Sequence, residues 1–321
     1  MTAIGQTCEF EATSRSIVDR LRQDLTDVLS LAGGLGEPSI LGGGEPVADA
    51  TTKVLIRDCT QHPRAVLIVS APAFPDLVAR NQAAAEAARA GLGADLGSVI
   101  PEPQLSGDLD GRSYLLLPYF DPLSASRLRR MIQRRWLVPQ LLEWLHRATR
   151  ATLQVPTEVE VRRDFVHPLQ SLASDDAIVA TIRAAAKLAA ARLETGSWAP
   201  RYVLTHDDLW VGNILLRGGS PLGRYRQQDR WPFVIIDWAG ARVRGHAMYD
   251  LVRLTKSMGL RRRLTDELRS HCQILGCEVV DARGYLLAAL GYLGMHLNQF
   301  PRERYVSTVA SCWSWMETIE S

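Results

Sequence analysis

Lysine is the residue that this sequence lacks most. Of its 37 lysine and arginine side chains, only Lys53, Lys187 and Lys256 are lysines. The first 186 residues therefore contain a single lysine, Lys53. Any role in that part of the chain that needs a lysine ammonium group falls to this one residue.

Long apolar runs are absent too. No run approaches the twenty or so residues of a membrane-spanning helix, so we expect no membrane span. Glu9, Glu11 and Arg15 stand where a signal peptide needs an apolar core, which argues against secretion. The five cysteines are an odd number without a C-x-x-C pair, which is typical of a reducing compartment. Together these absences predict a cytoplasmic protein.

One short segment carries side chains of the metal-binding kind, His271-Cys272 followed by Cys277. The further ligands that a zinc site needs are missing from this segment. We therefore interpret it as an apolar helix face with incidental cysteines.

The composition is that of a globular chain. Hydrophobic residues make up 46% and charged residues 22%, which excludes a mainly disordered or fibrous protein. Charge is unevenly distributed. Residues 1–121 contain 9 basic and 16 acidic side chains, a net charge of −7, whereas residues 122–321 contain 28 and 19, a net charge of +9.

Apolar periodicity predicts a small antiparallel sheet followed by a larger helical part, an α+β arrangement. The elements expected in the first part are helices over 14–32 and 75–92, strands over 53–57, 65–69 and 113–117, and a turn over 107–111. Those expected in the second part are helices over 124–154, with a break at Pro139, and 175–195, strands over 202–205, 213–217 and 233–237, and about three helices from residue 250 onwards.

Chemistry-bearing residues gather around the predicted strands of the second part. His206-Asp207-Asp208 follows one strand, Asn213 begins the next, and Asp237 ends the third. The hairpin geometry brings two carboxylates and one amide oxygen to a common point. Oxygen ligands of this kind suit Mg²⁺. A spare carboxylate beside the metal can accept a proton from an attacking hydroxyl, and phosphoryl transfer needs these parts.

These motifs carry a family resemblance. H-x-D-x-x-x-x-N followed by a strand ending in I-D-W resembles the aminoglycoside phosphotransferase and choline kinase branch of the protein-kinase-like fold. Tyr249–Leu251 resembles the Asp-Leu pair after the metal-binding Asp of that branch. Leu141–His146 resembles its helix ending in Leu-His, and Gly111–Leu116 the strand before its interlobe hinge. The resemblance extends over about residues 40 to 255, in the right order.

The resemblance implies a bilobal protein-kinase-like fold, with a small antiparallel-sheet N-lobe and a larger helical C-lobe. Residues 1–121 would form the nucleotide-binding lobe, and residues 122–321 the catalytic and acceptor-binding lobe. It also implies an Mg²⁺-dependent small-molecule kinase that transfers the γ-phosphoryl group of ATP or GTP to a hydroxyl of a small acceptor.

Carried over by position, the resemblance makes Asp208 the catalytic base and His206 a scaffold residue of the catalytic loop. Asn213 and Asp237 would be the metal ligands. Asp250 would steady the loop.

For the nucleotide, the resemblance implies that main-chain groups of a hinge at Pro118 and Phe120 hydrogen-bond adenine. Backbone amides of a glycine loop at Gly43 and Gly44 would hold phosphate. Glu86 would orient a phosphate-binding lysine, or is simply one exposed helix glutamate.

The sequence departs from the family at that lysine. Ile68 occupies the place where the third strand of the family carries it. Lys53 lies on the preceding strand, a position to which some protein kinases move this lysine. Two interpretations stay open: Lys53 replaces the missing residue, or it is a solvated strand lysine. An arginine, Arg57 or Arg64, is the fallback.

The acceptor is less constrained. From residue 251 to the end there are nine basic and seven acidic residues, and the acids form no dense cluster. The positive second part favours a neutral or anionic acceptor over a polycation. Nucleic acid is not expected, because the aromatics do not interleave with the arginines as a base-stacking surface requires.

Two hypotheses remain. The intact Asp208, Asn213 and Asp237 favour an active small-molecule kinase, of metabolic or antibiotic-inactivating role. Ile68 supports the alternative, a nucleotide-binding pseudokinase or interaction module.

Overall fold

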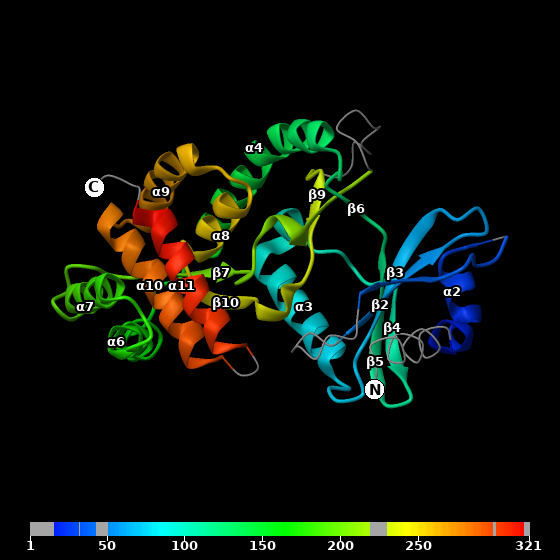
Figure 1. Ribbon diagram of the computed structural model, residues 1–321, viewed down its shortest axis with the longest axis horizontal. Coiled ribbons are helices and arrows are strands. Elements are labelled where there is room, and N and C mark those ends of the chain that lie inside the picture. Colours follow the sequence, from blue (N-terminus) through cyan, green and yellow to red (C-terminus); the bar gives the residue numbers. More distant parts are fainter. Residues whose placement is uncertain (1–15, 32, 43–50, 219–229, 298–299, 318–321) are drawn as a thin grey trace.

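The computed structural model describes residues 16–31, 33–42, 51–218, 230–297 and 300–317. A five-stranded antiparallel sheet lies at one end of the molecule, and helices form the other end (Figure 1). The predicted α+β class, with a small sheet and a larger helical part, is confirmed.

The sheet has the strand order β1-β2-β3-β5-β4. Its strands are β1 (Ser39–Gly42), β2 (Thr52–Arg57), β3 (Pro63–Val69), β4 (Leu105–Leu109) and β5 (Arg112–Pro118). Side chains alternate between its two faces. On one face Val54, Ile56 and Leu67 pack with Leu21 and Leu25 of the segment that contains helix α2 (Arg22–Val28). The opposite face is turned to the rest of the molecule.

Two predictions in this part were wrong. Residues 107–111 are not simply a turn, because Leu105–Leu109 forms strand β4 and the hairpin turns at Asp110 and Gly111. Both turn residues have positive φ, which Gly adopts freely and Asp tolerates. Helix α3 (Leu77–Gly97) also extends beyond the predicted end, with a kink at Gly93.

The second part contains eight α-helices and two small sheets among the described residues. The helices are α4 (Arg127–Ala151), α5 (Glu158–Val161), α6 (His167–Ser174), α7 (Ala180–Glu194), α8 (Tyr249–Ser257), α9 (Arg261–Leu275), α10 (Val279–Met295) and α11 (Arg302–Glu317), with the π-helix η1 (Arg162–Val166) between α5 and α6. The sheets are β6 (Asp121–Pro122) with β8 (Ile214–Leu216) and β9 (Phe233–Ile235), and β7 (Tyr202–Thr205) with β10 (Arg242–His246).

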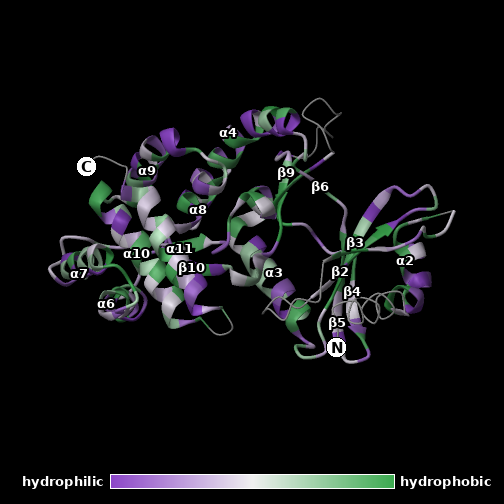
Figure 2. Ribbon diagram, in the orientation of Figure 1, coloured by the Kyte–Doolittle hydropathy of each residue, from purple (hydrophilic) through white to green (hydrophobic). Residues whose placement is uncertain are grey.

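Helix α4 continues through Pro139 without the predicted break. An interior proline costs a helix roughly 3 kcal/mol. Leu137, Val138, Leu141 and Leu142 are all buried around it, and their packing offsets that cost. Buried apolar residues of these helices form one hydrophobic core. The hydropathy colouring shows hydrophobic stretches along the same helices (Figure 2).

Sequence periodicity missed two segments of the second part. Strand β10 reads Arg-Val-Arg-Gly-His, a pattern without an apolar face, yet it pairs with β7. The segment from α5 to α6 was also not predicted. No helix within the described part of the chain has the length and apolarity to cross a lipid bilayer.

Candidate active site

His206 joins the two strand ends of the site. It follows β7 and is buried. Its Nδ1 accepts a hydrogen bond from the Asp208 backbone N–H at 3.2 Å, so its Nε2–H donates to the Ile236 carbonyl at 2.9 Å. Burial lowers the pKa of His206. The neutral imidazole thus ties the loop of residues 206–213 to the segment that leads into Asp237.

Asp250, near the start of α8, fixes the backbone of the same loop. Its buried carboxylate accepts the backbone N–H groups of His206 at 2.6 Å and Asp207 at 3.0 Å. Burial and the charge of Asp207 raise the pKa of Asp250 to about 7, while the backbone hydrogen bonds act in the opposite direction. A loop with two buried main-chain donors needs an acceptor here, and Asp250 supplies it.

Asp208 lies at the mouth of this loop with its side chain 47% exposed. Its carboxylate forms an ion pair with Arg253 of α8. The side-chain amide of Asn213 donates to the Asp208 backbone carbonyl at 3.0 Å and to its carboxylate at 3.3 Å. These contacts hold Asp208 and Asn213 together as a pair.

Asp237 is brought beside this pair by the β8–β9 hairpin. The Ile236 backbone N–H donates to the Asn213 carbonyl at 2.9 Å, directly before the exposed Asp237. Asp237 has φ 67° and Asp207 has φ 62°, both in the left-handed region. Non-glycine residues adopt this conformation at a cost, and such strain gathers at functional sites. The β8–β9 pairing therefore places the backbone just before Asp237 beside Asn213, which is itself hydrogen-bonded to Asp208.

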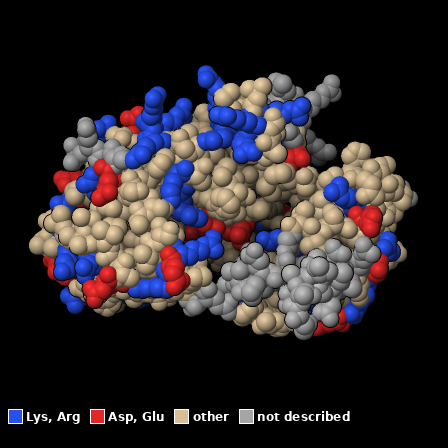
Figure 3. All heavy atoms as spheres, in the orientation of Figure 1, with Lys and Arg blue, Asp and Glu red and all other residues tan. Residues whose placement is uncertain are grey.

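A cavity of about 370 Å³ lies between the sheet and the helical part. Its walls contain predicted residues from both sides, namely Lys53, Glu86, Pro118, Phe120 and Asp237. Among the described residues, Asp208, Asn213 and His206 are not part of this lining. Ile236 and Asp237 do line the cavity, and the hydrogen bond from Ile236 to Asn213 places the other three residues next to it. Acidic side chains are visible at the base of the hollow between the two parts (Figure 3).

Lys53 and Ile68 are direct cross-strand partners in the β2–β3 ladder, and both line the cavity. Residues opposite each other in an antiparallel pair share a face, with Cβ atoms about 4.5–5.5 Å apart. A lysine at position 53 therefore starts only one strand away from the place where the family resemblance expects it. Arg57 lies further along β2 and Arg64 is exposed on β3, and neither is among the lining residues.

The remaining predicted residues have mixed positions. Glu86 is exposed on α3 and accepts a hydrogen bond from Gln82 at 2.8 Å. Gly43 and Gly44 lie outside the described residues. At the end of β5, the Tyr119 N–H donates to the Arg64 carbonyl at 3.1 Å, so it is used within the sheet.

Sequence reasoning missed Arg253 and Arg242, which pair with Asp208 and Asp207. Arg253 lies three residues after Asp250 on a predicted helix. Residues three apart share a helix face, so this spacing was a signal that Arg253 faces the same loop. Arg242 carried no such signal, because the strand that presents it was not predicted.

Comparison with known structures finds proteins with a similar architecture. The structure of a thermostable mutant of the aminoglycoside phosphotransferase APH(4)-Ia aligns over 91% of this chain and 97% of its own, with a TM-score of 0.52 and 14% identity. A choline/ethanolamine kinase family protein from Mesorhizobium loti aligns over 94% and 95%, with a TM-score of 0.51 and 16% identity.

No protein-family model and no curated protein matches the sequence. At such low sequence identity, the similarity shows a shared fold, and the activity has to be argued from the residues of the site. The predicted resemblance is thus confirmed at the level of architecture: the chain has the bilobal protein-kinase-like fold of the aminoglycoside phosphotransferase and choline kinase structures.

Proposed function

We propose that this protein is an Mg²⁺-dependent small-molecule kinase that transfers the γ-phosphoryl group of ATP or GTP to a hydroxyl of a small acceptor. The observation that carries the proposal is the convergence of Asp208, Asn213 and Asp237 on one hairpin mouth, beside a cavity that also holds Lys53. The comparison structures are named as a phosphotransferase and a kinase, which supports the same reaction class.

In this proposal Asp208 is the base. It is half-exposed and oriented by Arg253 and Asn213, so a bound acceptor hydroxyl can reach its carboxylate. Phosphoryl transfer depends mainly on positioning and on stabilising charge, and the base holds the hydroxyl in line and accepts its proton. His206 and Asp250 keep the loop backbone in place for this role.

The donor set fits Mg²⁺. The Asn213 amide nitrogen is used in donating to Asp208, so its carbonyl oxygen is the atom available for a cation. With the Asp237 carboxylate this gives a hard oxygen pair, and Mg²⁺ is held by few protein oxygens plus substrate phosphates. When bound, the cation supplies neutralisation of phosphate charge. Lys53 adds a second cation from the sheet side of the cavity.

The base of the nucleotide fits the apolar part of the cavity, between Ile68 and Leu117 on the sheet side and Leu215 on the other. Since Tyr119 N–H is already used, adenine or guanine would bond to the Pro118 carbonyl and the Phe120 N–H. Residues 1–121 thereby act as the nucleotide-binding lobe and residues 122–321 as the catalytic and acceptor-binding lobe.

A neutral or anionic acceptor suits the surface beyond the catalytic loop. The Val211 N–H donates to Ser257 Oγ at 3.0 Å, which places the end of α8 against this loop. Just past that end is an open cavity of about 990 Å³. Its basic lining residues are Arg127, Arg130, Arg134, Arg135 and Arg263. Basic side chains crowd this region of α4 and α9 in the surface view (Figure 3). A polycation would be repelled there.

The test compares wild type with Asp208→Asn. Loss of a general base typically lowers the rate by about a hundredfold to ten-thousandfold. We expect ATP or GTP turnover with a library of hydroxylated acceptors to fall by that factor, while calorimetry shows unchanged Mg²⁺–nucleotide binding. Equal turnover would place the base elsewhere. Nucleotide binding without turnover in the wild type, across the library, would favour the pseudokinase alternative.

A further inference from the structure

A second cluster of chemistry-bearing side chains lies between α4 and α9 of the helical part. It consists of His146 on α4 and of Glu267 and His271 on α9. One ligand atom of each lies within 4.8 Å of the other two. Glu267 and His271 are four residues apart, so they share one face of α9. The fold brings His146 to that face from the neighbouring helix.

These three atoms are buried, and none of them makes a hydrogen bond within the described part of the chain. Among the described residues, His146 Nε2, Glu267 Oε2 and His271 Nε2 each lack a hydrogen bond. His146 Nε2 and Glu267 Oε2 lie 3.0 Å apart, but they are not aligned as a hydrogen bond. A buried polar atom left unsatisfied costs about 1–3 kcal/mol. One cation bound among the three atoms would satisfy all of them at once.

The orientation of His271 suits a metal ligand. Its side chain is 2% exposed, and its Nδ1 lies 2.8 Å from the Glu267 backbone carbonyl. A carbonyl only accepts, so Nδ1 carries the proton and Nε2 presents its lone pair to the cluster. Metal-binding histidines are typically fixed by such a bond from the other ring nitrogen.

We propose that His146, Glu267 and His271 form a binding site for Zn²⁺. Two imidazoles with one carboxylate are ligands that zinc prefers, whereas Mg²⁺ takes oxygen ligands. Tetrahedral zinc at about 2.0–2.2 Å from each ligand sets ligand atoms roughly 3.3 Å apart. The His146–Glu267 separation of 3.0 Å is already close to that value. Small rotations of the side chains would bring the third ligand atom, His271 Nε2, to the same distance.

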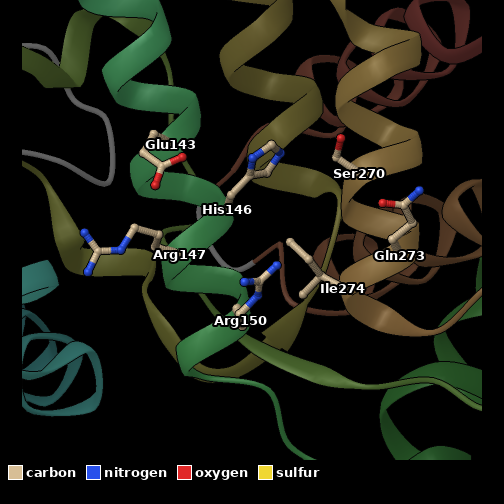
Figure 4. Close-up of a pocket in the computed structure, with 7 residues that line it drawn as sticks. All are labelled: Glu143, His146, Arg147, Arg150, Ser270, Gln273 and Ile274. Carbon is tan, nitrogen blue, oxygen red and sulfur yellow. The ribbon is translucent and has the colours of Figure 1, made fainter.

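A cation can reach this site from solvent, and its binding would link two helices. A cavity of about 500 Å³, lined by residues including His146, Glu143 and Gln273, opens between α4 and α9 (Figure 4). Figure 4 shows the His146 ring directed from α4 toward α9. Water from this cavity can take the fourth position. The cation would hold α9 against α4, next to the helix that carries Asp250 and Arg253.

The test uses the full chain, stripped of metal by a chelator and kept free of nucleotide. Titration with Zn²⁺ against a chromophoric zinc indicator should give one equivalent bound per chain and a higher unfolding temperature. Glu267→Gln keeps the shape of the side chain and should weaken binding by at least about a hundredfold. His271→Ala should do the same, and the exposed His167→Ala is the matched control.

Co²⁺ gives a readout that does not depend on a variant that folds poorly. Bound to the wild type, it should show the intense visible bands of a low-coordinate site without a sulfur-to-cobalt charge-transfer band. That band would instead place the ion on Cys272 and Cys277 and overturn the proposal. Equal Zn²⁺ affinity in wild type and Glu267→Gln would also overturn it. Asp237→Ala should leave Zn²⁺ binding unchanged, which separates this site from the proposed catalytic one.

Discussion

The proposed catalytic loop, residues 206–213, lies next to the cavity that the sheet wall lines, and the two regions are built differently. In the loop, His206, Asp208 and Asn213 lie within eight residues and are joined by hydrogen bonds through buried polar groups. In the sheet wall, Lys53, Ile68 and Leu117 come from three strands and meet only because strand register aligns them. The loop can therefore be recognised as a sequence motif, whereas the composition of the sheet wall depends on how the strands pair. The loop cannot tolerate exchange of its members, but the wall allows its lysine to move between partner positions.

Of the substitutions that test this contrast, Asp237→Ala, on the loop side, has the largest expected effect. Removing one carboxylate from the proposed oxygen pair should weaken Mg²⁺–ATP binding by at least about a hundredfold. Calorimetry with and without Mg²⁺ measures it, and binding of ATP without metal should change little. Unchanged affinity for Mg²⁺–ATP would remove Asp237 from the metal assignment.

The sheet wall is tested by moving its cation. Lys53→Met removes a charge-assisted contact with phosphate, and we expect the rate to fall by about tenfold to a hundredfold. Because position 68 is the direct cross-strand partner, the double variant Lys53→Ile with Ile68→Lys should regain most of that loss. Turnover of the acceptor is the measurement.

Lys53→Arg is the control for charge, and it should keep more activity than Lys53→Met. If Lys53→Met is as active as wild type, the lysine is a structural strand residue. If the double variant stays as slow as the single one, position 68 does not reach the phosphates.

Asp250→Asn tests how the loop is held. The amide offers one acceptor oxygen where the His206 and Asp207 N–H groups need two. One buried donor is then unsatisfied, which should lower the free energy of unfolding by about 2 kcal/mol. Urea denaturation measures it. Asp110→Asn, which breaks an exposed ion pair with Arg20 beside the sheet, should change stability by less than about 1 kcal/mol. Equal effects of the two substitutions would contradict the role given to Asp250.

The smallest expected effect is on the fall of the free energy of unfolding as the pH drops below neutral, which we call the acid limb of the stability curve. Burial and the charge of Arg242 lower the pKa of His246, on β10, to about 4. The folded pKa is below the unfolded value of about 6.5, so stability is complete above pH 6.5 and falls as the pH drops toward 4. At pH 5.5 the free energy of unfolding should be about 1 kcal/mol lower than at neutral pH.

His246→Asn should make this part of the stability curve flatter, as followed by thermal unfolding between pH 7 and about 5. His62, in the β2–β3 hairpin of the sheet part, is exposed, and His62→Asn should leave the curve unchanged. The same slope in His246→Asn and wild type would show that His246 does not govern the acid limb.

Prediction from sequence succeeded where neighbours along the chain also interact in space. Residues 206–213 and the strand before Asp237 form a local hairpin, so their spacing was enough to place them. It failed where burial overrides local preference. Pro139 predicts a helix break, yet four buried neighbours keep α4 continuous. β10 has no apolar alternation, and its pairing with β7 comes from the tertiary structure.

By itself, the sequence determined the motif of the proposed catalytic loop and the fact that Lys53 is the lysine available to the sheet part. Only the tertiary structure decided that Lys53 shares a rung and a cavity with Ile68. It also decided that His271, which has too few ligands in its own segment, lies beside Glu267 and His146. The physical reason is distance along the chain. Hairpin and helix geometry fix contacts between near neighbours, whereas His146 and His271 meet only because the hydrophobic core packs α4 against α9.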